Sequence, residues 1–144
     1  MTKRQKHFWI EVTLLVLVTA AIATAIIASE MQPLNKNDIK ANASDIRSFA
    51  ATALRLHEQH QRQQLTEQFF AAEVELLSEK VDATKEALES ESGPDAENDR
   101  REAADLSTEL RNAVEKLSAG DDSVAQTFAT VESRSKQLED RLSQ

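Results

Sequence analysis

The chain has no cysteine, no tyrosine, two glycines and two prolines among its 144 residues. Without cysteine it has no disulfide scaffold, thiol chemistry or cysteine-ligated metal site. Two glycines leave no glycine-rich loop of the kinds that bind phosphate groups. Only 4% of residues are aromatic, and 17 Lys and Arg against 25 Asp and Glu give a net charge of −8. Since nucleic-acid binding needs basic patches and stacking platforms, we expect no nucleic-acid partner.

The residues that are abundant are Ala, Glu, Leu, Gln and Ser, a composition typical of long helices. The length suits one modest domain. The sequence therefore indicates an architecture and a place in the cell more clearly than a biochemical activity.

Residues 12–29 form an uncharged run of 18 residues. Together with the apolar residues 8–10, which precede Glu11, they give a segment of about 22 residues, or ~33 Å as a helix. That length crosses a bilayer core. The sequence predicts an uncleaved transmembrane helix (a signal-anchor) over residues 8–29.

Basic residues precede this segment, and no acidic residue is present among the first ten. By the positive-inside rule, we expect residues 1–7 in the cytoplasm and the rest beyond a cell (inner) membrane, in the periplasm or its equivalent. The expected anchor residues are Lys3, Arg4, Lys6 and the interfacial Trp9.

Small residues recur at a spacing of four within the segment, at Ala21, Ala25 and Ser29. This spacing allows two membrane helices to approach closely. We expect the bilayer itself, and either a second copy or another envelope protein, as partners.

A cleaved secretory signal is the alternative interpretation, because Ala23-Thr24-Ala25 has the form of a cleavage site. Cleavage there would leave an apolar new N-terminus at Ile26, and the uncharged run exceeds the usual signal-peptide core. Both interpretations place the bulk of the chain outside the cytoplasm.

Helix-breaking residues occur at three places after this segment: at Pro33, at Gly93-Pro94 and at Gly120. They predict a linker over 30–36 and three helices, listed in chain order as 37–92, 94–119 and 121–143. Short connections between them favour antiparallel neighbours.

The apolar residues of all three predicted helices alternate by three and four, which is typical of coiled-coil-like packing. A helix over 37–92 would be ~80 Å long, whereas the next two would reach only ~36 and ~33 Å. The predicted fold is all-α: a transmembrane helix, a long stalk helix and a distal antiparallel three-helix bundle.

The proximal stalk carries apolar residues on adjoining faces, namely Ile39, Ile46, Phe49, Ala53 and Leu56. A lone helix cannot bury such a stripe. We expect it to bind a partner.

A break within residues 57–64 is the alternative, and it would give an up-down four-helix bundle. The segment is polar, but it contains no Gly, Pro, Asn or Asp, and the apolar register crosses it without a slip. Continuity is therefore the preferred interpretation.

His57, His60 and Glu67 fall on one helical face and are the candidate metal ligands. The spacing of the two histidines is not that of zinc proteases, which place them at i and i+4. A solvated polar stretch explains the same residues, so we expect no metal and no other cofactor.

Many carboxylates lie between residues 73 and 102, but a catalytic pair needs a concave, water-poor pocket. Thin helical seams offer little such volume, and no Gly-x-Ser-x-Gly turn is present. We expect no enzyme and no catalytic residues.

The resulting expectation is a non-enzymatic, single-pass membrane protein whose exported helices act as a structural, scaffold or protein-interaction component of a cell envelope. The alternative is an extracytoplasmic sensory or ligand-binding bundle that works with a separate transmembrane partner, since the composition broadly resembles that of chemoreceptor ectodomains. A phage-lysis (spanin) or division-scaffold role, or a soluble adaptor if the segment is cleaved, remains open.

Overall fold

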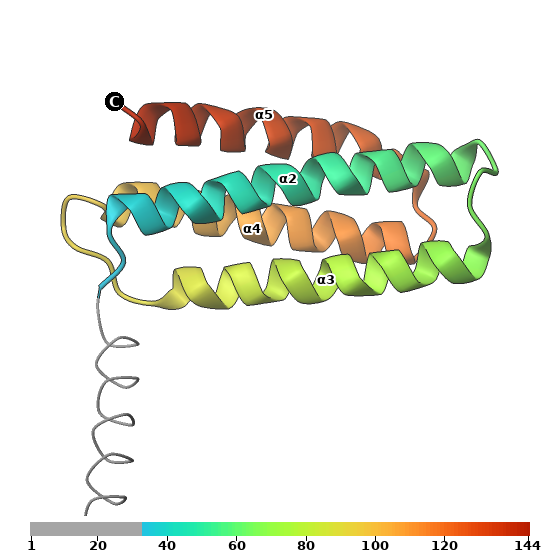
Figure 1. The fold of residues 1–144 in the computed structure, drawn as a ribbon, viewed down its shortest axis with the longest axis horizontal. Helices are drawn as coiled ribbons and strands as arrows, with labels where there is room; N and C mark the ends of the chain where they lie inside the picture. Colours follow the sequence, from blue (N-terminus) through green and yellow to red (C-terminus); the bar gives the residue numbers. More distant parts are fainter. Residues whose placement is uncertain (1–32) are drawn as a thin grey trace, which may run out of the picture. The chain divides into compact units, whose positions relative to one another are not determined.

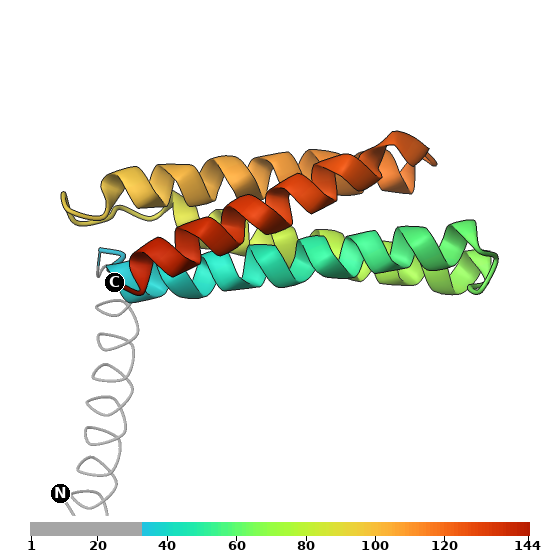
Figure 2. The ribbon, with the colours of Figure 1, turned by 90° about the horizontal axis from the view of Figure 1, so that it is seen from above.

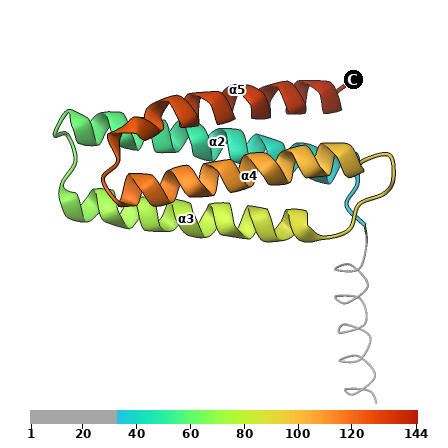
Figure 3. The same ribbon diagram turned by 180° about the vertical axis from the view of Figure 1, so that it is seen from behind.

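The computed structural model describes residues 33–144, which form an all-α bundle of four helices (Figure 1). The elements are α2 (Lys36–Gln61), α3 (Glu67–Glu89), α4 (Glu97–Ser118), a short 3₁₀ turn η1 (Asp122–Val124) and α5 (Ala125–Leu142). Successive helices run in opposite directions, so the topology is up-down-up-down, as the views from both sides show (Figures 1 and 3). The expectation of an all-α fold is confirmed.

One continuous apolar core joins the four helices. Each helix contributes a row of buried residues spaced alternately by three and four, the spacing that keeps one face toward its neighbours. The fully buried large side chains include Ile39, Ile46, Leu88, Leu106, Leu110, Phe128 and Leu138. Burial of this kind stabilises a domain by roughly 1.5–3 kcal/mol per large side chain.

The most extensive contact in the bundle is between α2 and α5, followed by that between α3 and α4. Three of the buried residues on α2 are alanines, namely Ala43, Ala50 and Ala53, and small side chains allow neighbouring helices to approach closely. Seen from above, α5 runs obliquely from the end of α4 to the beginning of α2 (Figure 2). Helices α3 and α4 also contact α2, so the apolar face of α2 is buried by the other three helices together.

The helix ends are capped by local hydrogen bonds. Asn35 and Asp38 form a reciprocal capping box at the start of α2. Asp121 accepts a 2.9 Å hydrogen bond from the Ser123 amide, and hydrogen bonds from Ser123 lower the pKa of the Asp121 carboxyl. Gly120 (φ 77°) ends α4 in the left-handed conformation that glycine adopts without steric cost.

The connection from α3 to α4 is held by backbone and side-chain bonds. The Leu34 amide donates to the Glu91 carbonyl at 2.8 Å, which ties the beginning of α2 to the end of α3. Glu97 accepts hydrogen bonds from Arg100, Ser92 and Arg101. These three donors hold the pKa of the Glu97 carboxyl far below its ordinary range, with Arg100 contributing most.

The prediction of a single stalk helix over 37–92 is wrong, and so is the three-helix bundle that followed from it. The chain turns between α2 and α3, where Gln63 takes the left-handed conformation (φ 56°) and the Gln64 amide donates to the Gln59 carbonyl at 2.9 Å. Thr66 then caps α3 by accepting a hydrogen bond from the Phe69 amide at 3.3 Å. The alternative of a break near 57–64 describes the fold, since folding back buries both apolar faces against each other.

The predicted transmembrane segment, residues 8–29, lies outside the described residues, as do residues 1–7 and part of the 30–36 linker. Among the helices between residues 33 and 144, none combines the length and the apolar character needed to cross a bilayer. Helices α4 and α5 lie within the ranges 94–119 and 121–143.

Candidate functional site

The stripe predicted to bind a partner is not a free surface. Ile39, Ile46 and Ala53 are completely buried, and Leu56 is almost so, because the other three helices pack against α2. Phe49 is half-buried at the edge of the core. The prediction is wrong for a physical reason: the stripe is satisfied within the chain once α2 is one of four helices.

The residues predicted to anchor the chain and to pack membrane helices all fall outside the range that the structure describes. They are Lys3, Arg4, Lys6, Trp9, Ala21, Ala25 and Ser29.

The histidines and Glu67 surround the turn between α2 and α3. His57 is buried near the end of α2. His60 stacks on Phe70 of α3, with ring centroids 4.0 Å apart and an interplanar angle of 15°. His60 Nε2 lies 3.8 Å from Glu67 Oε1, whereas Nδ1 is buried and has no hydrogen-bond partner between residues 33 and 144.

The three candidate ligands do not converge on a common point. In the described part of the chain, no group of three or more His, Asp or Glu side chains is arranged to hold a metal ion. The Glu67 side chain is 86% exposed, so water covers the carboxylate that would complete such a site. His60 instead contributes a flat ring to the packing of α2 against α3.

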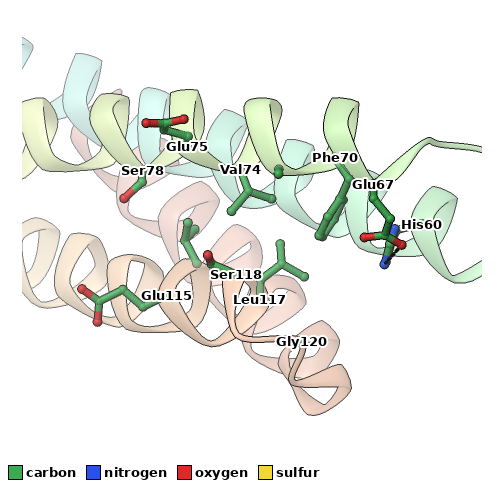
Figure 4. A pocket seen from close by; sticks show the side chains of 12 residues that line it. His60, Glu67, Phe70, Val74, Glu75, Ser78, Glu115, Leu117, Ser118 and Gly120 are labelled. Atoms are coloured by element: carbon green, nitrogen blue, oxygen red, sulfur yellow. Dashed lines mark ion pairs between the residues drawn. The ribbon is translucent and has the colours of Figure 1, made fainter.

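A groove of about 620 Å³ begins at His60 and runs between α3 and α4 (Figure 4). Its apolar floor is formed by Phe70, Val74, Val114 and Leu117, and carboxylates of Glu67, Glu75 and Glu115 stand at its edges. An adjoining hollow of about 360 Å³ reaches His57 and the η1 turn, where Gln61 donates a hydrogen bond to Asp122.

Ion pairs hold part of the rim of this groove. Glu115 is engaged by Arg111 at 2.7 Å, and Arg111 also binds Asp82 of α3 at 2.5 Å. These ion pairs raise the pKa of the Arg111 guanidinium, and the hydrogen bond to Asp82 contributes most. An apolar floor with carboxylates at its rim suits a small molecule that has an apolar body and a positive group.

A second feature is the outer face of α3, where Phe69 is 50% and Leu76 44% exposed. They are the two large hydrophobic residues that residues 33–144 leave exposed, and their spacing of seven places them on the same side of the helix. A recess of about 140 Å³ beside Leu76 is shared with Phe49 of α2.

Sequence reasoning missed this face, although a signal was present. Phe69-Phe70 and Leu76-Leu77 are two pairs of adjacent apolar residues seven positions apart. Neighbouring residues on a helix point about 100° apart, so only one of each pair can enter the core. Phe70 and Leu77 are buried, and Phe69 and Leu76 are left on the surface.

Comparison with protein-family models, with curated proteins and with solved structures finds no match for this chain.

Proposed function

We propose that this chain is a non-enzymatic protein-interaction component of a cell envelope, and that it binds its partner through the outer face of α3. The observation that carries the proposal is the exposure of Phe69 and Leu76 on one side of a helix whose remaining large apolar residues are buried. Isolated exposed apolar residues are common, but two at heptad spacing form the beginning of a helix-packing seam.

The energetics support binding at this face. About half of each side chain is still in contact with water. Covering the exposed half of each side chain would stabilise a complex by roughly 1 kcal/mol, about half of what full burial of such a side chain contributes. Two such anchors do not make a tight complex alone, so this face suits an interaction that a membrane tether strengthens by raising the effective concentration.

In this proposal residues 8–29 anchor the protein in the membrane, with residues 1–7 in the cytoplasm and the bundle on the opposite side. Support comes from the uncharged run at 12–29 and from the three basic residues that precede it. N-terminal sequencing of the protein recovered from membranes tests this part. An intact N-terminus is expected, and a mature chain beginning at Ile26 would contradict it.

Site-specific photo-crosslinking in native membranes tests the interaction face. A photoreactive amino acid is placed at Phe69 or at Leu76, and a matched control is placed at Lys136, which is exposed on α5. Crosslinked protein is expected at the two α3 positions and not at the control. Equal crosslinking at all three positions would refute a specific role for this face.

A ligand-binding bundle is the second candidate, and the groove between α3 and α4 favours it. Its test is thermal unfolding in the presence of simple alkylammonium ions, which carry an apolar body and a positive charge. Stabilisation that disappears in Glu75→Gln is expected if the groove is the site. Stabilisation unchanged by this substitution would exclude it.

A further inference from the structure

We infer that the partner of the α3 outer face is a second copy of this chain, packed with its α3 antiparallel about a two-fold axis at Leu76. The inference rests on the proposed function and deepens it by naming the partner. The α3 seam is defined as Phe69, Ala72, Leu76, Ala83 and Ala87, all exposed on α3.

The α3 seam is continuous along the helix. At about 100° per residue, Phe69, Leu76, Ala83 and Ala87 lie within a narrow sector, and Ala72 lies beside it. The core residues Phe70 and Leu77 point about 100° away, into the bundle. Another helix can therefore lie along this sector while the core stays closed.

The sizes of the side chains fit an antiparallel copy. A two-fold axis at Leu76 sets Leu76 against its own equivalent and Phe69 against Ala83 of the second copy, because both are seven positions from the axis. Each large ring then faces a small residue, which is how packed interfaces avoid voids and overlaps. A parallel pair would set Phe69 against Phe69 and Ala83 against Ala83, crowding one layer and emptying the other.

The charges fit as well. Glu73 and Lys80 flank the α3 seam on the side of α2, since both line the recess shared with Phe49. In the antiparallel arrangement, Glu73 of each copy lies close to Lys80 of the other, which gives two reciprocal ion pairs. Within residues 33–144, neither side chain is engaged in an ion pair.

Cysteine crosslinking of the full chain in mild detergent tests the inference, and the absence of native cysteine gives a clean background. Leu76→Cys is expected to form a disulfide-linked dimer under mild oxidation, because the axis brings the two positions together. Lys136→Cys, on the exposed side of α5, is the control and should remain monomeric. The inference is overturned if Leu76→Cys forms no more dimer than this control.

A mixed-label experiment tests the orientation. Phe69→Cys and Ala83→Cys, each carrying a different tag, are expected to crosslink to each other far more than either crosslinks to itself. Preferential self-crosslinking of Phe69→Cys would indicate a parallel pair and would overturn the antiparallel assignment. Helical content by circular dichroism confirms that each variant is folded.

A charge swap tests the same geometry without cysteine. Lys80→Glu sets like charges against Glu73 at both reciprocal contacts and is expected to weaken self-association about five- to tenfold. Adding Glu73→Lys restores opposite charges and should recover most of the affinity, as measured by sedimentation. A wild-type chain that sediments as a monomer at high concentration would overturn the inference.

The outcomes also separate this inference from the proposed function. Failure of self-association combined with photo-crosslinking of Leu76 to a different protein overturns the second copy and leaves the interaction role standing. Failure of both experiments overturns both.

Discussion

Replacing Ile46 by alanine separates a helix packed within a bundle from a helix that stands alone. Ile46 lies in the middle of α2 and has no exposed surface, because α2 is packed against the other helices of the bundle. On a free stalk the same residue would be open to water. The substitution therefore has very different costs in the two architectures.

The expected cost in the bundle follows from the burial of the side chain. Removing the three outer carbons of a fully buried isoleucine destabilises a domain by about 2–5 kcal/mol, which includes the cavity left behind. For a domain of this size, each kcal/mol lowers the melting temperature by roughly 4 °C, so Ile46→Ala should lower it by about 8–20 °C.

Thermal and urea unfolding of the full chain, followed by circular dichroism at 222 nm, measures this difference. Arg55→Ala is the matched control, since Arg55 is exposed on the same helix, and it should change stability by no more than about 0.5 kcal/mol. If Ile46→Ala costs no more than Arg55→Ala, α2 is not packed within the bundle and the reasoning fails.

Three further predictions concern single positions, each checked by the same unfolding measurements. Gly120→Ala should destabilise the protein by about 1 kcal/mol, because Gly120 has φ 77°. Gly93→Ala should be neutral or slightly stabilising, since Gly93 has no positive φ and a Cβ added there would meet no neighbouring atom. Equal effects of the two substitutions would show that backbone strain at Gly120 is not responsible. Gln63→Gly should stabilise the protein by about 0.5 kcal/mol, because glycine adopts the left-handed conformation at φ 56° without the steric cost that a Cβ imposes. A loss of stability would contradict that turn geometry. Glu97→Gln should destabilise the protein at neutral pH, and progressively less as the pH falls below about 4. The reason is that a carboxyl whose pKa is lowered in the folded state stabilises the fold above its unfolded-state pKa and loses this effect when it is protonated. A loss of stability that does not change with pH would refute the role assigned to the ionised Glu97 carboxylate.

The fold class and most helix boundaries were accessible from sequence because glycine and proline mark two of the three connections between helices. The third connection uses Gln63 in a conformation that glycine usually supplies. The apolar register also continues across this connection. An unbroken helix over 37–92 and two shorter helices would therefore show the same apolar pattern. Length and periodicity alone could not distinguish them.

A local signal at that connection could have decided the question. Leu65-Thr66-Glu67 has a capping residue followed by an acidic residue in the first turn of a helix. Leu65 precedes the cap, and Phe70 occupies the fourth helical position, which is the spacing of a hydrophobic staple. In the structure both residues belong to or pack against the core.

The candidate site was only partly accessible for the same reason. His57, His60 and Glu67 were identified by residue type, and the structure does place His60 next to Glu67 across the turn. Which apolar residues remain exposed depends on the directions from which the neighbouring helices approach. The turn at Gln63 sets how α2 and α3 face each other, and in this arrangement Ile46 is buried and Leu76 is exposed.

The turn at Gln63 folds the chain back on itself and thereby leaves the α3 outer face free. Its most direct test is a distance measurement by pulsed electron paramagnetic resonance between spin labels on cysteines introduced at Lys36 and Glu89. The two ends are expected within about 30 Å, since the Leu34 amide donates to the Glu91 carbonyl at 2.8 Å in the folded bundle. A separation of ~80 Å, the length of an unbroken helix over this span, would show that the chain does not turn at Gln63.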